Sequence, residues 1–211
     1  GAPDYALLTG TEGLPPPLAR LQWSPLPAAE AEVAAIAARF RADRRLVVTG
    51  AAATKAAFAA AGRDGTLAST RYLHVAAHGH LSPGAPQWSS LVLAGERAAP
   101  GYVTAAEIAT YAIGADLVVL AACETALGKD VAGEGVFGLP YALTVAGARA
   151  TLLSLWPVSD DSAGAFMARF YARLARGRAP AVALAETKRE FIRDPKYAAP
   201  FHWAPWVLYG G

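Results

Sequence analysis

The stretch Asp116-Leu117-Val118-Val119-Leu120-Ala121-Ala122-Cys123 indicates the fold of this 211-residue chain more clearly than any other. Its unbroken apolar run is typical of a central parallel strand that is covered on both faces. A second run, Arg71-Tyr72-Leu73-His74-Val75-Ala76-Ala77, is followed by His78-Gly79. If the two runs form neighbouring parallel strands, a thiol and an imidazole emerge at the carboxyl edge of one sheet, which is where open α/β sheets place their chemistry.

Strand-like and helix-like patterns alternate along the chain. Strands are predicted at 46–48, 71–77, 91–93, 116–122, 149–156 and 203–209, with an edge strand at 18–23. Helices are predicted at 28–41, 54–61, 104–111, 136–146, 161–176 and onward from Pro180. Residues 1–13 are expected to be an irregular extension, and residues 79–90 and 124–134 to be loops. The pattern favours a single α/β domain over residues 1–211, with a mostly parallel central sheet and helices on both faces.

Composition argues against several classes of protein. The net charge is only +2 and the basic residues are scattered, so nucleic-acid binding is not expected. The longest apolar segment, 136–158, is interrupted by glycine, proline and arginine, and no membrane association is expected. The chain begins with Gly1 and has no signal-peptide pattern, which suggests a piece of a longer protein. A single cysteine fits a reducing compartment, and we expect a cytoplasmic location.

His78 and Cys123 form the candidate catalytic pair. A thiol beside an imidazole is deprotonated near neutral pH and becomes a strong nucleophile. Gly79 has no Cβ, so its amide can approach a substrate carbonyl closely, and with the amide of Cys123 it would form an oxyanion hole. Each residue also has a plain structural explanation: a histidine at a strand end, a glycine in a turn, and an inert buried thiol.

Two other kinds of site are also compatible with parts of the sequence. Residues 133–138 satisfy the dinucleotide pattern G-x-G-x-x-G, but they do not follow a strand directly, as that site requires. A flexible hinge and close helix packing explain these glycines better. His74, His78 and His80 alternate and would share one face as zinc ligands, but Cys123 would have to be the fourth ligand and no acid lies nearby. We therefore predict neither a metal nor a cofactor.

Asp160 and Asp161 follow the predicted strand at 149–156. Acids at a helix start satisfy free amides and suit the helix dipole, so N-capping is one explanation. They would also form an acidic wall near the carboxyl edge of the sheet, where they can pair with a basic substrate side chain. The two roles are compatible.

Several blocks of the sequence resemble the CHAT domain, the caspase-like domain that accompanies tetratricopeptide repeats. The likeness rests on His78-Gly79 and on Ala122-Cys123-Glu124-Thr125, and it continues at 133–136, 146–149, 154–161 and 203–208. It covers the chain from residue 14 to the end. The resemblance implies a caspase–haemoglobinase fold and a Cys–His peptidase related to caspases and separase, with His78 as base and Cys123 as nucleophile.

Departures from the caspase pattern concern substrate choice. Ala121 and Thr125 stand where caspases have glutamine and glycine around the nucleophile. After Trp156 the chain has Pro157 and then two acids, where caspases have an arginine. Separase-like proteins carry a similar Leu-Trp-x-Val-Thr-Asp segment and prefer arginine. By that similarity Asp160 would be the specificity residue, with Asp161 as its substitute.

The sequence thus predicts a cysteine endopeptidase that cleaves protein or peptide substrates, with preference for a basic residue before the cut. The resemblance implies an upstream tetratricopeptide-repeat or sensor region outside this chain. We expect residues 124–134 to be mobile and to be a region of self-cleavage. The alternative function is a latent or non-catalytic CHAT domain that serves signalling or assembly.

Overall fold

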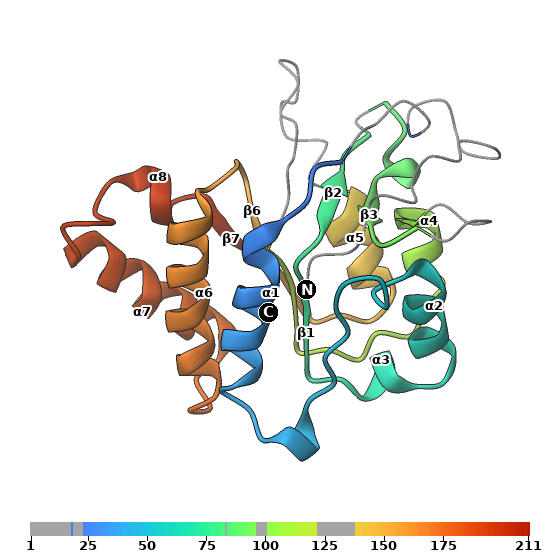
Figure 1. Ribbon diagram of the computed structural model, residues 1–211, viewed down its shortest axis with the longest axis horizontal. Coiled ribbons are helices and arrows are strands. Elements are labelled where there is room, and N and C mark those ends of the chain that lie inside the picture. The colour runs from blue at the N-terminus through green and yellow to red at the C-terminus, as the bar shows by residue number, and fades with distance from the viewer. Residues whose placement is uncertain (1–17, 19–22, 83, 96–100, 122–137) are drawn as a thin grey trace.

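The computed structural model describes residues 18, 23–82, 84–95, 101–121 and 138–211 (Figure 1). Within these ranges the strands are β1 (Tyr72–Val75), β2 (His78–His80), β3 (Ser90–Val92), β4 (Tyr102–Thr104), β5 (Leu117–Leu120), β6 (Ala150–Ser154) and β7 (Trp206–Gly210). The helices are α1 (Pro27–Ala37), α2 (Lys55–Arg63), α3 (Thr66–Ser69), α4 (Ala105–Ile108), α5 (Gly138–Val145), α6 (Asp160–Leu174), α7 (Pro180–Arg193) and α8 (Pro200–Trp203). Short 3-10 turns lie at Ala42–Arg44 and Pro86–Trp88.

The main sheet has the strand order β1-β5-β6-β7. Strands β1, β5 and β6 are parallel, and β7 runs antiparallel to β6 at one edge. All four residues of β5 are buried, which confirms the central parallel strand predicted at 116–122. In the register of β1 and β5, Val75 lies opposite Leu120, so these two strands end side by side.

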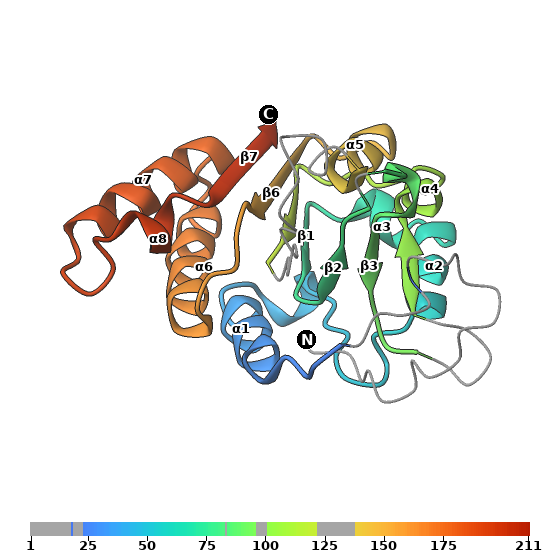
Figure 2. The ribbon, with the colours of Figure 1, turned by 90° about the horizontal axis from the view of Figure 1, so that it is seen from above.

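Helices cover both faces of the main sheet (Figure 2). On one face, α1, α6 and α7 enclose an aromatic core that includes Phe166, Phe170 and Trp206. On the other face, α4 contributes Ile108 and α5 contributes Leu143 to a mainly aliphatic core, together with Leu67 of α3 and Phe58 of α2. The predicted α/β class with a mostly parallel sheet and two helical layers is confirmed. No helix in the described ranges is long and apolar enough to cross a bilayer.

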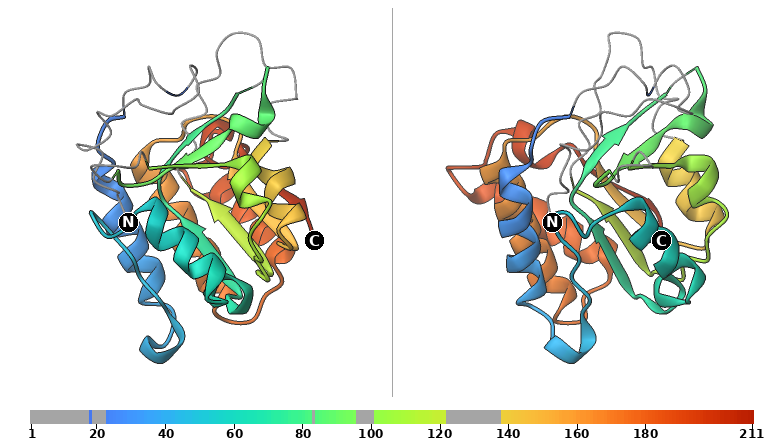
Figure 3. Two further views of the ribbon diagram at one scale, coloured as in Figure 1. Left: turned by 90° about the vertical axis from the view of Figure 1, so that its right-hand side faces the viewer. Right: turned by 45° about the vertical axis from the view of Figure 1, so that its right-hand side comes forward.

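A second, smaller sheet stands at the carboxyl end of β1 (Figure 3). Its order is β2-β3-β4, with antiparallel neighbours, and His78 lies opposite Val92. The prediction of a loop over 79–90 was wrong in part, because β2 continues to His80 and β3 begins at Ser90. A three-residue strand carries too short a pattern for its period to be recognised. The strand β4 was not predicted for the same reason.

Two other predicted strands differ from the structure. Residues 46–48 form no strand, and Leu46 is 71% exposed, since none of the strands in the described part of the chain pairs with this short run. The predicted strand at 203–209 begins only at Trp206, since Pro200 opens the short helix α8 ahead of it. The predicted cap at Thr104 is confirmed: it forms a capping box with Glu107. Most of the predicted edge strand at 18–23 and the extension at 1–13 lie outside the described residues.

Candidate active site

His78 is the first residue of β2, three positions beyond the end of β1. Its side chain is fully buried, with an exposed fraction of 0%. The ring of Trp23 lies against it, with 5.0 Å between ring centroids and a tilt of 35°. The Ala76-Ala77 link between β1 and β2 is only two residues long and is buried, so His78 stays close to the carboxyl end of β1.

A backbone carbonyl fixes the orientation of the His78 ring. The Nε2 atom lies 2.7 Å from the carbonyl oxygen of Ser24. A carbonyl can only accept a hydrogen bond, so Nε2 must carry a proton. In the neutral ring the basic nitrogen is then Nδ1. His78 is thereby held in one tautomer, which is a requirement for a general base of fixed direction.

The segment that supplies the carbonyl is itself anchored to the small sheet. The indole Nε1 of Trp23 donates a hydrogen bond of 2.7 Å to the hydroxyl of Tyr102 on β4. Burial raises the pKa of Tyr102, so this hydroxyl stays protonated. Leu18, Val92 and Tyr102 form a small apolar cluster beneath Trp23. Trp23 and Ser24 therefore do not sit on a free loop.

Of the other predicted members of the dyad and the oxyanion hole, Gly79 is among the described residues and Cys123 is not. Gly79 lies inside β2 opposite Leu91, with extended backbone, so the explanation of this glycine as a turn residue was wrong. Cys123, the loop 124–134 and most of the G-x-G-x-x-G segment lie outside the described residues. The chain can be followed to Ala121, whose amide donates to the carbonyl of Val75 over 3.1 Å.

The histidines predicted as alternative zinc ligands have other surroundings. Both ring nitrogens of His74 are engaged, by Glu32 at 2.9 Å and by Tyr171 at 3.1 Å. Burial lowers the pKa of His80, which favours its neutral form. Among the described residues no three His, Cys, Asp or Glu side chains are arranged to hold a metal ion.

The two acids of the predicted specificity wall differ in what holds them. Both are exposed and lie in the first turn of α6, at the carboxyl end of the main sheet. Asp161 accepts a hydrogen bond from Tyr197 at 3.0 Å and pairs with Lys196 at 2.9 Å. Lys196 first and Tyr197 second hold the pKa of Asp161 below its ordinary value. Asp160 makes no hydrogen bond or ion pair with any described residue, so its carboxylate is the one that remains available.

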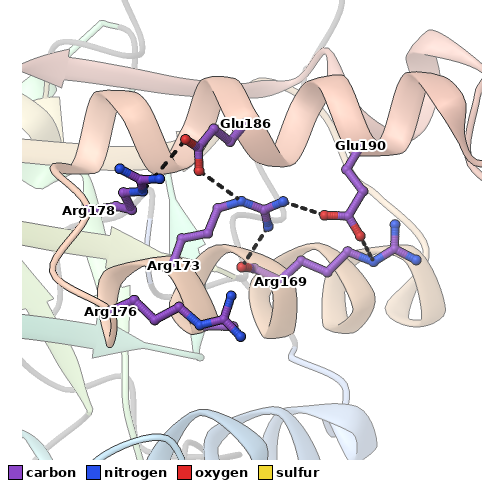
Figure 4. A pocket seen from close by; sticks show the side chains of 7 residues that line it. Arg169, Arg173, Arg176, Arg178, Glu186 and Glu190 are labelled. Atoms are coloured by element: carbon purple, nitrogen blue, oxygen red, sulfur yellow. Dashed lines mark hydrogen bonds and ion pairs between the residues drawn. The ribbon is translucent and has the colours of Figure 1, made fainter.

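A charged cavity of about 350 Å³ lies elsewhere, between α6 and α7 (Figure 4). Four arginines and two glutamates line it, and Arg173 bridges Glu186 and Glu190. Arg169 and Arg178 pair with the same two carboxylates. Because these ion pairs already join the two helices, the cavity is explained by the packing of α6 on α7. None of the predicted site residues lines it.

Sequence reasoning missed Ser24. It predicted no third partner for His78, because a carbonyl oxygen belongs to every residue and leaves no trace in a sequence pattern. The signal that was present is indirect. The segment Trp23-Ser24-Pro25-Leu26-Pro27 combines a large aromatic residue with two prolines, which together indicate a rigid, packed connection.

A mixed, mostly parallel sheet with helices on both faces and a strand-end histidine at its carboxyl edge define a caspase-like α/β domain. Comparison with protein families matches residues 10–211 to the CHAT domain, and the chain belongs to this family. The resemblance found in the sequence is thus confirmed over nearly the whole chain.

Two curated relatives share about half of the chain. Over 108 residues, or 51% of this chain, it is 32% identical to Tetratricopeptide repeat protein 28 of Homo sapiens. It is 31% identical over the same length to the protein of that name from Mus musculus. The matched segment makes up only 4% of either relative.

Proposed function

We propose that this domain is a cysteine endopeptidase in which His78 is the general base and Cys123 the nucleophile. The observation that carries the proposal is the hydrogen bond from His78 Nε2 to the Ser24 carbonyl. A general base must present one basic nitrogen in one direction, and this hydrogen bond fixes the His78 ring in that way. Membership of a caspase-like family supports the same chemistry.

Chain connectivity supports the pairing of the two residues. The Ala121 amide is bonded to Val75, where β1 ends. Cys123 follows Ala121 by two residues, a reach of at most about 7 Å, and His78 follows Val75 by three, a reach of at most about 11 Å. The two segments that lead to Cys123 and His78 therefore leave the main sheet side by side at its carboxyl edge.

The proposed reaction follows from these roles. His78 Nδ1 takes the proton of the Cys123 thiol, and the thiolate attacks the scissile carbonyl. The amides of Gly79 and Cys123 stabilise the oxyanion, a contribution worth on the order of hundredfold in rate for each donor. The imidazolium then protonates the leaving amine, and water hydrolyses the thioester with His78 again as base.

We propose Asp160 as the residue that selects a basic side chain before the cut. It is exposed at the carboxyl edge of the sheet and has no partner among the described residues. Asp161 is a weaker candidate, because Lys196 and Tyr197 already occupy its carboxylate. An incoming arginine would have to displace them. Proteins and peptides are the substrate class, and self-cleavage within 124–134 stays a prediction.

The second candidate is a latent domain that is switched on, or used only for assembly, by a region outside this chain. The observation that favours it is the 0% exposure of His78, which leaves a substrate no access to the ring in this state. The names of the two relatives suggest a tetratricopeptide-repeat region as the partner in the same polypeptide. Latency and peptidase chemistry are compatible.

The test is cleavage of a peptide library with Arg, Lys, Leu, Met or Asp before the scissile bond. Wild-type protein is compared with Cys123→Ala, both alone and with any upstream region. Cysteine-dependent cleavage after Arg or Lys supports both the dyad and Asp160. Cleavage after an apolar residue supports the dyad and contradicts the role of Asp160. Cleavage that persists in Cys123→Ala contradicts the mechanism.

A further inference from the structure

A second buried histidine, His74, lies inside β1 and joins two helices to the sheet. Its Nε2 lies 2.9 Å from Glu32 of α1, and its Nδ1 lies 3.1 Å from the hydroxyl of Tyr171 of α6. The side chains of His74 and Glu32 are only 9% and 11% exposed, and Tyr171 is 1% exposed. None of the three takes part in the proposed reaction, so this polar cluster needs another explanation.

One arrangement of hydrogen bonds satisfies all three groups of the cluster. Burial, then the carboxylate of Glu32, raise the pKa of Tyr171 well above its ordinary value, so its hydroxyl keeps its proton. That hydroxyl can donate to His74 Nδ1, and His74 Nε2 then donates to the Glu32 carboxylate. All three groups are satisfied in this order, which makes the cluster a fixed connection between β1, α1 and α6.

Glu32 gives α1 a polar anchor in addition to the packing of this helix on α6, to which Ile36 contributes. Only Ala29 and Ile36 of its eleven residues are buried, and its first turn has no side-chain cap. The hydrogen bond to His74 is therefore a direct polar connection from α1 to β1. Buried charge-assisted bonds of this kind are stronger than neutral ones.

A stiff connection links this anchor to His78. Ser24, whose carbonyl orients His78, is followed by Pro25, Leu26 and then Pro27, the first residue of α1. The two prolines fix their own φ angles and restrict the residue before each of them. Glu32 lies five residues further on, about 7.5 Å along the helix axis. A shift of α1 is thus transmitted to the Ser24 carbonyl with little loss.

We propose that Glu32 is a positioning residue for His78: held by His74 and Tyr171, it sets α1 so that the Ser24 carbonyl meets His78 Nε2. This inference rests on the proposed function of His78 for its effect on catalysis. Its structural part stands apart from activity, because the tautomer of His78 is observable whether or not the domain cleaves peptides.

The test compares Glu32→Ala, Glu32→Gln and Glu30→Ala by nitrogen-15 NMR of the imidazole rings. The chain has four histidines, and single histidine variants assign them. Glu32→Gln keeps an oxygen that accepts from His74 and is expected to keep the wild-type His78 signals. Glu32→Ala is expected to lose the single Nε2-protonated form of His78. Glu30 is exposed on the same helix, so Glu30→Ala is the matched loss of charge.

Kinetics supply the second readout where the wild type cleaves. Glu32→Ala is expected to lower kcat by about tenfold or more with little change in KM, since the base is misaligned while substrate contacts are kept. Glu32→Gln is expected to keep the wild-type kcat, because its amide oxygen still accepts the hydrogen bond from His74. Wild-type His78 signals in folded Glu32→Ala would overturn the proposal. Should Glu32→Ala not fold, unchanged His78 signals in Tyr171→Phe, which keeps the ring packing, together with unchanged signals in Glu32→Asp, would overturn it as well.

The peptidase proposal and the positioning role of Glu32 can be tested separately, even if the wild-type domain is inactive. If the isolated domain cleaves nothing but the His78 signals depend on Glu32 as described, the positioning role stands and the peptidase proposal loses support. If cleavage is cysteine-dependent but the His78 signals ignore Glu32, the peptidase proposal stands and the positioning role is contradicted.

Discussion

His74 and His78 lie four residues apart on one stretch of chain, yet they occupy two different regions of the molecule. His74 is in the interior region between β1, α1 and α6, where a carboxylate and a tyrosine hydroxyl from the two helices bind its ring. His78 is at the carboxyl edge, where its Nε2 meets a backbone carbonyl. Both are buried, so burial alone does not distinguish a structural from a catalytic histidine.

The difference lies in the kind of partner. A carboxylate bound to one ring nitrogen and a hydroxyl bound to the other consume both hydrogen-bonding positions of His74, which makes it a connector. The carbonyl that binds Nε2 of His78 fixes the ring in one orientation, with Nδ1 as its basic nitrogen. We therefore expect changes at the edge to affect mainly catalysis. Changes in the interior region should affect stability and, through the position of α1, lower catalysis by a smaller factor.

The largest expected effect separates the two histidines directly. His78→Asn should lower kcat/KM for cysteine-dependent peptide cleavage by about a thousandfold or more, because the general base is lost. His74→Asn should lower the free energy of unfolding by about 2–4 kcal/mol, because Glu32 is left buried without its partner. Peptide cleavage and urea unfolding measure the two. Loss of activity in His74→Asn equal to that in His78→Asn, at unchanged stability, would erase the distinction.

The two acids of α6 sharpen the description of the edge. Asp160→Asn should reduce kcat/KM for substrates with arginine before the cut by about tenfold to hundredfold, through loss of a charge-assisted hydrogen bond, and leave stability unchanged. Asp161→Asn is the matched control and should change kcat/KM for the same substrates by less than about threefold. Equal effects of the two substitutions would show that the substrate displaces Lys196 and Tyr197 from the Asp161 carboxylate.

A conservative change tests the interior region. Tyr171→Phe keeps the buried ring in contact with Phe40 and His74 but removes the hydroxyl. The free energy of unfolding is expected to fall by about 1–2 kcal/mol, because His74 Nδ1 loses its partner in a buried place. Urea unfolding of both proteins gives the difference. An unchanged value would mean that water or a rearranged ring replaces the hydroxyl.

The smallest expected effect is a pH dependence. The folded-state pKa of Asp161 is lowered below its ordinary value of 3.8 by Lys196 and Tyr197. A lowered pKa contributes stability that is present above the unfolded value and is lost as the pH falls through the folded value. Asp161→Asn should therefore slightly flatten the acid side of the stability profile, measured by urea unfolding from pH 6 downward. An identical acid slope in the variant would show that the pair is not maintained in solution.

The strongly patterned parts of the fold could be predicted from the sequence. The unbroken apolar residues of β5, the helical spacing in α6 and α7 and the capping pattern at Thr104 each signal one structure. In the small sheet the strand predicted at 91–93 corresponds to β3, whereas β2 and β4 could not be predicted, because they are three residues long and their pairing is set by tertiary contacts. Leu46 to Val48 show the converse case: a β-favouring composition without a partner strand forms no strand.

Only those parts of the candidate site that consist of side chains could be predicted from the sequence. His78 and Gly79 are signalled by their place after an apolar run, and Asp160 by its place at a helix start. The Ser24 carbonyl and the link from Glu32 through His74 depend on the approach of α1 to β1. No local pattern in either segment encodes that approach.

The pH dependence of Cys123 alkylation tests the central claim most directly, because Cys123 is the sole cysteine and the reaction needs no substrate. In wild-type protein the rate of modification by iodoacetamide should reach half its maximum well below about 8.5, the ordinary pKa of a thiol. His78→Asn should move that midpoint to about 8.5 or above. A wild-type midpoint at the ordinary value, unchanged by His78→Asn, would contradict a His78–Cys123 pair.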